Sequence, residues 1–308
     1  MSDSRRRFLQ GMGAIGAGGV LASLAPAARA QEAKAVPTTL GRYSLGIGNS
    51  WTIAISRAEA RFLTPSHRMT DSGAAGPPRL PEFEVTLQLS GGQFIFQWIN
   101  EALAGKPSLR DGFLDYVAGN RTTERVSFFK AALTRVSLDK LNGAVKGVPT
   151  ATIVFNAQAT RIDKGGATLP PPPRPVPVLA SNFTVGLQGM ELREVMEVTW
   201  PEIAIGQNST RLGPLKLAMP TRGAAASHPL VQWLGEGAKG APSARSGKIA
   251  LLDPGFRTEL LSCNLAGVRP LSVSMPALDP NQIQRLEAEL LVGSMQFAWH
   301  ADSAAPRA

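Results

Sequence analysis

The stretch QWINEALAGKPSLRDG at residues 97–112 and the stretch QWLGEGAKGAPSARSG at residues 232–247 are nearly the same sixteen residues written twice, 135 positions apart. The repeat keeps turn positions as well as apolar ones, and turn length is itself a structural constraint. We therefore interpret the chain as a tandem duplication in which both copies fold alike. The shared structural positions are Trp98, Glu101, Gly105, Arg110 and Gly112 in the first copy, and Trp233, Glu236, Gly240, Arg245 and Gly247 in the second copy.

The repeat extends to both sides of these stretches. Continued without a gap, the same offset pairs Ser127 with Ser262. Toward the N-terminus, the apolar residues at 85–89 match those at 215–219 after a five-residue adjustment. A shared register through these segments predicts the same order of strands and helix in both copies.

Each copy has the pattern of a small β structure with one helix. Residues 84–89 alternate polar and apolar side chains, as a half-buried strand does. Apolar residues then recur at helical spacing over 94–102, and Gly105 supplies a left-handed stop; the second helix begins at Pro229 and stops at Gly240. We predict a mainly β fold of two tandem antiparallel β-sandwich or barrel modules, each with one short flanking α-helix.

A hairpin and a closing strand complete each copy. The first hairpin turns at Gly119–Asn120 and the second at Asp253–Pro254–Gly255. Residues 151–162 alternate as a strand does. Their partner segment, 286–297, is ambiguous alone, and we assign it as a strand because the repeat requires it.

The chain divides at a proline-rich run, PPPPRPVP at residues 170–177. Such a run forms neither helix nor interior strand and is typical of an extended, semi-rigid spacer. Its alternative use is as a ligand for an aromatic-lined groove. The predicted organisation is a leader at 1–30, a first module at 31–162, a Pro-rich linker at 163–180, a second module at 181–302 and a tail at 303–308.

The first thirty residues resemble a twin-arginine signal peptide, with a basic motif, a glycine-rich apolar stretch and a small-x-small cleavage site. We expect the mature chain to begin near Gln31 and to act in the periplasm, at the cell surface or outside the cell. An uncleaved leader that anchors the chain is the alternative. No later segment has the roughly 18 continuous apolar residues of a membrane span. The signal rests on Arg5, Arg6, Phe8, Leu9, Ala28 and Ala30.

The residue inventory argues against a catalytic, cofactor or metal site. Cys263 is the only cysteine, which excludes an internal disulfide and a multi-cysteine metal site. The three histidines are far apart, and no Gly-x-Ser-x-Gly motif occurs. The formal charge is +9, but the basic residues are dispersed, so we expect no nucleic-acid partner. We expect no cofactor, no metal and no enzymatic activity.

In their order, these features resemble the tube proteins of contractile bacteriophage tails and the haemolysin-coregulated tube proteins of type VI secretion. The resemblance lies in a strand, a tryptophan-bearing helix, an Arg-x-Gly hairpin start, a long loop and a closing strand. It covers residues 43–162 and 182–300. The first copy departs from the pattern by having Ala118–Gly119–Asn120 at the hairpin turn. The second copy matches best, through Trp233, Arg245, Gly247 and Asp253–Pro254–Gly255.

The resemblance implies a non-enzymatic structural protein whose rings stack into a hollow tube. Open edge strands are pairing surfaces unless something covers them. Six modules close a ring in this family, so a duplicated chain would form a pseudo-sixfold ring as a trimer. The implied partner is the chain itself, together with other tail-like or envelope proteins.

Two departures from the family keep alternatives open. Phage tubes assemble in the cytoplasm, so the leader indicates a co-opted module, and the duplication is unusual for contractile tubes. Docking of the two copies within one chain would instead give a monomeric periplasmic binding protein with its ligand between the modules. An exported enzyme is a third interpretation. A cleft ringed by polar residues favours binding, whereas bare edge strands favour assembly.

For the repeated polar residues we favour structural roles. Trp98 and Trp233 would each anchor a helix on its sheet by burying a large ring. The two repeated arginines would pair with the local carboxylates of Glu101 and Glu236. Contacts with a tube lumen or with an interface are the alternative for these arginines.

Overall fold

The structure is a computed structural model. It describes residues 43–300 with gaps at 49, 53–54, 62–65, 70–74, 92, 119–120, 167, 169–177, 191, 193, 207–208, 222–226, 238–239, 241 and 276–283. The leader positions, most of the proline-rich run and the tail therefore lie outside the described residues. No helix in the described part of the chain is long and apolar enough to cross a membrane.

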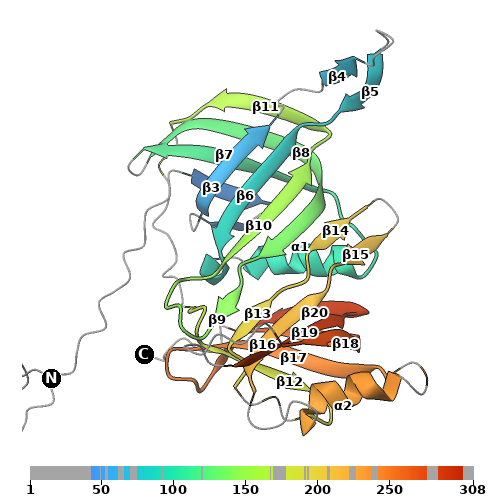
Figure 1. Cartoon of the computed structure of the whole chain (residues 1–308). Helices are drawn as coiled ribbons and strands as arrows, with labels where there is room; N and C mark the ends of the chain where they lie inside the picture. Colours follow the sequence, from blue (N-terminus) through green and yellow to red (C-terminus); the bar gives the residue numbers. More distant parts are fainter. Residues whose placement is uncertain are drawn as a thin grey trace, which may run out of the picture. The chain divides into compact units, whose positions relative to one another are not determined.

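The described residues of the N-terminal half form eleven strands, one short 3-10 helix and one α-helix, and Figure 1 labels β3 to β11 and α1. These elements are β1 (Tyr43–Ile47), β2 (Ser50–Thr52), β3 (Ile55–Arg61), β4 (Ser66–Met69), β5 (Ala75–Arg79), β6 (Glu82–Gln88), η1 (Leu89–Gly91), α1 (Gln93–Leu103), β7 (Arg110–Ala118), β8 (Arg121–Leu138), β9 (Leu141–Asn142), β10 (Thr150–Asn156) and β11 (Ala159–Lys164).

The C-terminal half repeats much of this order. Its elements are β12 (Phe183–Leu187), β13 (Glu197–Thr199), β14 (Ile203–Ile205), β15 (Thr210–Leu212), β16 (Leu215–Pro220), α2 (Pro229–Glu236), β17 (Arg245–Leu252), β18 (Glu259–Ser274), β19 (Arg285–Leu291) and β20 (Ser294–Trp299).

The prediction of a mainly β, two-module fold is confirmed. The described strands form a ten-stranded sheet in the order β2-β1-β7-β8-β10-β6-β3, with β11, β14 and β15 attached, and an eight-stranded sheet in the order β12-β17-β18-β19-β16-β13-β9, with β20 attached. In each half one long strand joins two groups of strands. The first part of β8 pairs with β7 and β11, and its last part pairs with β10; β18 does the same with β17, β20 and β19.

The cores follow from the apolar periodicity. Alternate residues of β6 are buried, and α1 buries the side chains that recur at helical spacing. The ring of Trp98 meets that of Phe155 at a centroid distance of 5.7 Å, and Phe155 stacks on Phe83 at 5.0 Å. Buried aromatic pairs of this kind hold a helix on a sheet.

The ungapped register predicted through the hairpins is wrong by two residues. Gly112 and Gly247 are equivalent at the predicted spacing, yet Gly112 pairs with Phe128 whereas Gly247 pairs with Leu265. Residues of β8 are therefore equivalent to those 137 positions later in β18, and Ser127 matches Asn264 rather than Ser262.

The backbone supports the corrected register. Lys130 and Gly267, which are 137 residues apart, both have positive φ, at 49° and 64°. The shift arises in the second hairpin turn, where the Asp253 carboxylate accepts hydrogen bonds from the backbone N–H groups of Arg257 and Thr258 and so closes a longer loop. Because side chains alternate along a strand with a period of two, a two-residue shift leaves every face unchanged.

The strand β6 shows a second, smaller correction. Leu87 pairs with Ala151 of β10, and Met219 pairs with Leu286 of β19, so Leu87 is equivalent to Met219. The adjustment before the helix is therefore three residues rather than five. Each closing segment is also two strands, because β10 and β11 pair with different parts of β8.

The two helices end differently. In α1, Gly105 has φ +71° and the backbone N–H of Lys106 donates to the Glu101 carbonyl at 3.0 Å, which is a left-handed helix stop. Helix α2 begins at Pro229 as predicted but ends at Glu236, before the predicted stop at Gly240. Glycines within and just after the last turn weaken this helix.

Candidate functional site

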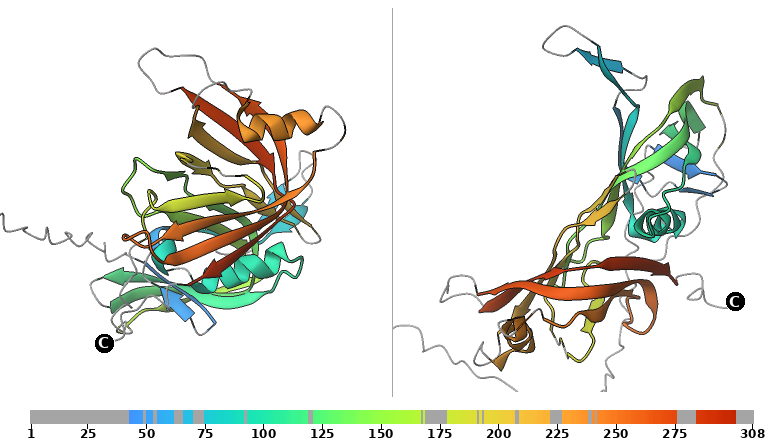
Figure 2. Two further views of the ribbon diagram at one scale, coloured as in Figure 1. Left: turned by 90° about the horizontal axis from the view of Figure 1, so that it is seen from below. Right: turned by 90° about the vertical axis from the view of Figure 1, so that its right-hand side faces the viewer.

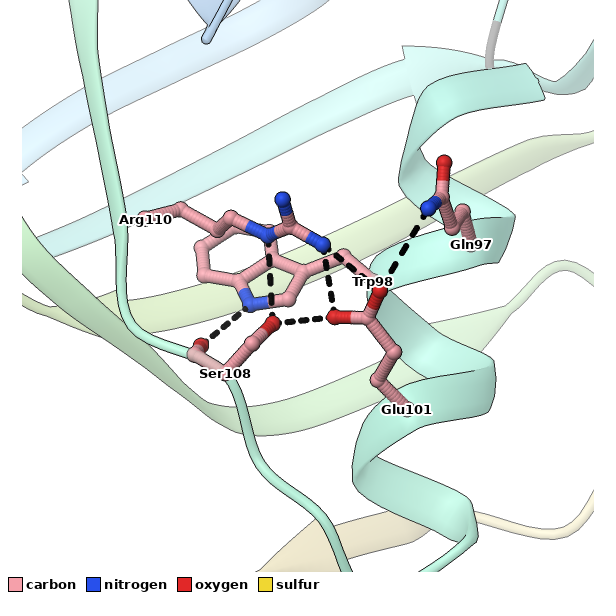
Figure 3. A network of polar contacts seen from close by, with 5 residues as sticks. All are labelled: Gln97, Trp98, Glu101, Ser108 and Arg110. Carbon is pink, nitrogen blue, oxygen red and sulfur yellow. Dashed lines mark hydrogen bonds and ion pairs between the residues drawn. The ribbon is translucent and has the colours of Figure 1, made fainter.

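The repeated tryptophans occupy the same environment in both halves. The Trp98 indole N–H donates to the Ser108 carbonyl at 3.0 Å (Figure 3). The Trp233 indole N–H donates to the Ser243 carbonyl at the same distance. Both side chains are 1% exposed. Each tryptophan therefore ties its helix to the connection that leads into the next strand.

The Arg110 guanidinium lies against the Glu101 carboxylate in the first half. One of its nitrogens is 2.6 Å from each carboxylate oxygen, and the hydroxyl of Ser108 also donates to Glu101 (Figure 3). Burial alone would raise the pKa of Glu101, but the hydrogen bonds from Ser108 and Arg110 and the arginine charge together lower that pKa. The carboxylate is thus held in its charged form.

The corresponding arginine in the second half is oriented differently. Arg245 lies 3.7 Å from Glu236, and it donates to the Gln188 carbonyl at 3.0 Å. Its guanidinium carbon is 5.1 Å from the centre of the Trp233 ring. Both arginines therefore contact the nearby glutamate, and the contact is tight only in the first half.

Gly112 and Gly247 permit close approach between strands. A Cβ added at Gly112 would lie 2.2 Å from the Gly46 carbonyl oxygen, and one added at Gly247 would lie 2.6 Å from the Leu187 side chain. The Trp, Arg and Glu positions form a structural anchor for the helix in each half, whereas the glycines let neighbouring strands pack closely.

Two groups with nucleophilic potential, the Cys263 thiol and the Ser262 hydroxyl, are buried. Burial raises the pKa of the Cys263 thiol to about 12, so the thiolate is not formed near neutral pH. The Ser262 hydroxyl contacts the His300 ring at 3.0 Å, but the Ser262 side chain is 2% exposed and a substrate does not reach it. Among the described residues no group of three or more His, Cys, Asp or Glu side chains could hold a metal ion.

A cavity of about 340 Å³ lies over β13, β16, β18 and β19. Its charged lining is already paired, because Lys140 binds Glu197 and Lys216 binds Glu289 at 2.6 Å. A charged ligand would have to displace these ion pairs. The cavity is therefore a weaker candidate for a functional site than the surfaces through which the two halves meet.

The two halves meet first through a sheet edge. Ile203 and Ala204 of β14, in the C-terminal half, pair with Val136 and Arg135 of β8, in the N-terminal half. The reverse exchange occurs at β9, where Leu141 pairs with Val198 of β13. Strand addition of this kind satisfies backbone groups that would otherwise remain open at an edge.

The second contact joins α1 to β20. The Asn100 side chain donates to the Phe297 carbonyl at 2.7 Å and accepts from the Phe297 N–H at 2.8 Å. The Phe96 and Phe297 rings meet at 5.2 Å, and the Thr210 hydroxyl donates to the carbonyl of Ala102, in the last turn of α1, at 3.0 Å. Figures 1 and 2 show α1 beside β20 in views at right angles.

The equivalents of these contact residues are less buried. Phe297 is 3% exposed, whereas Ile162, at the same place in β11, is 53% exposed. Val136 of β8 is fully buried and pairs with Ile203 of β14, but the matching residue Val273 of β18 pairs only with β19 among the described strands. One side of the contact is thus covered within the chain, and its counterpart is exposed at Ile162 and only partly buried at Val273.

Asn100 and Phe297 are not among the residues predicted from the sequence to matter. The signal that marks them is a break in the repeat, because Asn100 aligns with Gly235 and Phe297 aligns with Ile162. Such breaks in an otherwise matched register indicate positions whose surroundings differ between the copies. The anchor residues, in contrast, repeat because their surroundings repeat.

Similar proteins were found only among solved structures. No protein-family model and no curated protein matches the chain. Among solved structures, it is similar to the tube-terminating cap of the anti-feeding prophage, with a TM-score of 0.33 and 15% identity over 44% of this chain and 95% of that chain. It is also similar to Hcp1 from Flavobacterium johnsoniae (TM-score 0.32, 14% identity, 41% of this chain and 98% of that chain) and to a chain of the sheath-tube complex of the PVC extracellular contractile injection system (TM-score 0.31, 16% identity, 40% and 93%).

Proposed function

We propose that the chain is an exported, non-enzymatic structural subunit that assembles with copies of itself into rings or stacked rings, as a phage tail-tube subunit does. The observation that carries the proposal is the strand exchange between the halves. Strand β14 extends the edge of β8, and the corresponding edge of β18 has no such strand among the described residues.

The contact between the halves is of the head-to-tail kind. The N-terminal half contributes α1 and the end of β8, whereas the C-terminal half contributes β20 and β14. Contacts between unlike surfaces repeat until a ring closes or a filament grows. Six modules per ring, as the resemblance implies, would need three chains.

The proposal includes a tandem duplication of one tube-like module. The indole bond to a serine carbonyl, the arginine beside a glutamate and the positive-φ residue of the long strand recur in both halves at matching places. These matches support two tandem tube-like modules, at 31–162 and 181–302, joined by the Pro-rich linker. The leader at 1–30 supports export and action in the periplasm or outside the cell, where tail-like or envelope proteins would be further partners.

The test is the molar mass of the mature chain from Gln31, measured by size-exclusion chromatography with light scattering and followed by negative-stain imaging. The proposal expects rings or filaments with three chains per layer. A chain that stays monomeric at tens of micromolar would contradict it and would favour the binding-protein alternative, with the cavity beside Lys140 as the first place to search for a ligand.

A further inference from the structure

We infer that β11 of one chain docks on α2 of the next chain, through the surfaces equivalent to those that join β20 to α1 within a single chain. The inference rests on the proposed function, the assembly of this chain with itself. It specifies which surfaces meet and which residues lie at the centre of the contact. The occupant of each open surface is a second copy of this chain.

The equivalence of β11 and β20 follows from strand register. Ile162 pairs with Val126 of β8, and Phe297 pairs with Cys263 of β18. Val126 and Cys263 are themselves equivalent, because they pair with matching residues of β7 and β17. Ile162 therefore occupies the place that Phe297 occupies in the other half.

The equivalence of α1 and α2 follows from the tryptophan anchors, which fix both the position and the rotation of each helix. Phe96 then corresponds to Val231, and Asn100 corresponds to Gly235. Phe96 is buried against β20, whereas Val231 is only partly buried. A Cβ added at Gly235 would meet nothing within 4 Å, so the position is open.

The residues on the two open surfaces are all smaller than their counterparts in the contact within the chain. Phenylalanine, phenylalanine and asparagine in the contact within the chain correspond to isoleucine, valine and glycine on the two open surfaces. Smaller side chains on both surfaces let a strand approach a helix more closely. In the contact between chains, β11 is therefore expected to lie closer to α2 than β20 lies to α1. Ile162 would pack on Val231, and the backbone of β11 would lie against Gly235.

The hairpin β4–β5 provides a second element on the β11 side. It lies between β3 and β6, as β14–β15 lies between β13 and β16, and it forms a two-stranded sheet of its own within the described residues. Figure 1 shows it extending beyond the ends of β3 and β6. Within the chain, β14 pairs with β8 at Arg135 and Val136. The equivalent edge lies at Ser272–Val273 of β18. The hairpin β4–β5 of one chain would pair with this edge in the next chain.

The test uses one variant for each surface. Ile162→Asp places a charge at an exposed position on the β11 surface, and Gly235→Arg fills the open space on α2 with a residue that favours the helix. Neither change removes a buried group. The matched control is Leu109→Asp, because Leu109 is 52% exposed and its counterpart Ala244 is also exposed, so the contact within the chain does not cover this position.

Each variant and the wild-type chain are measured by light scattering at equal concentration, with circular dichroism as the check on folding. We expect wild type and Leu109→Asp to assemble and the other two variants to be folded monomers. A mixture of Ile162→Asp with Gly235→Arg retains one intact pair of surfaces and should give a dimer and nothing larger.

The remaining outcomes separate the two proposals. A wild-type chain that does not assemble contradicts the proposed function itself. Assembly of wild type together with unchanged assembly of Ile162→Asp and Gly235→Arg overturns the inference alone. Assembly that is lost in only one of these variants, or a mixture that stays monomeric, also overturns it, because a contact between β11 and α2 requires both surfaces and is restored by mixing.

Discussion

Helices α1 and α2 derive from nearly the same sequence but have different surroundings. Helix α1 has eleven residues, of which five are buried, and β20 covers its outer side. Helix α2 has eight residues, of which Leu230 and Trp233 are buried. Because the tryptophan anchor is the same in both, the anchor does not cause the difference. The glycines at 235 and 237 account for the shorter α2, and the second difference lies in what covers each helix.

The largest expected effect comes from breaking the covered contact. Phe297→Ala removes a buried ring that packs on α1, and we expect a loss of about 3–5 kcal/mol in the free energy of unfolding. Ile162→Ala changes an exposed side chain and should alter the free energy by less than about 0.5 kcal/mol in the monomer. Denaturant unfolding at low protein concentration measures both. Equal losses would contradict the contrast between the two surfaces.

The next largest effect is expected at Gly112 and Gly247, the two glycines where strands approach closely. In Gly112→Ala the new methyl group would meet a backbone oxygen at 2.2 Å, which cannot move aside, so we expect a loss of about 1–3 kcal/mol. In Gly247→Ala it meets the end of the flexible Leu187 side chain at 2.6 Å and the Gly186 carbonyl at 3.1 Å, and the loss should be smaller. A larger loss at Gly247 would show that the equivalence of β7 and β17 is misjudged.

The smallest effect concerns the ion pairs. Glu101→Gln should lower stability by about 1 kcal/mol at neutral pH, because the pair is about one third exposed and partly screened. Glu236→Gln, whose partner is 3.7 Å away, should cost about 0–0.5 kcal/mol. Thermal unfolding of both variants alongside wild type provides the measurement.

The pH dependence of this effect has a definite sign. The folded state lowers the pKa of Glu101 below its ordinary value of 4.5, so its contribution is fully present above that value. The contribution is lost as the pH falls through the lowered pKa, since both folded and unfolded states then bind the proton. The difference in stability between wild type and Glu101→Gln should therefore disappear in acid. A difference that persists there would contradict the assigned cause.

Much of the fold could be predicted from local patterns. The alternation in β6 and the helical spacing around Trp98 each indicate one element without knowledge of the rest of the chain. The repeated Arg and Glu positions also lie close enough in sequence for their pairing to be expected. These predictions depend on period and short spacing, which the sequence displays directly.

The strand register and the contact between the halves could not be predicted in the same way. A two-residue shift between β8 and β18 preserves the alternation, so the apolar pattern does not detect it. Strands β9 and β14 have two and three residues, which is too short for a pattern, and they pair with distant partners. The importance of Asn100 and Phe297 depends on folding that brings positions 197 residues apart into contact.

The most direct test of the account is chemical crosslinking between chains. Ile162→Cys and Val231→Cys, combined in one chain and treated with a short bis-maleimide, place the two reactive thiols on the proposed surfaces, while Cys263 stays buried. We predict covalent species that end at three chains on a denaturing gel, and no crosslink when either new cysteine is present alone. A product confined to single chains, or chains linked through Ile162→Cys alone, would contradict the claim that β11 of one chain meets α2 of the next.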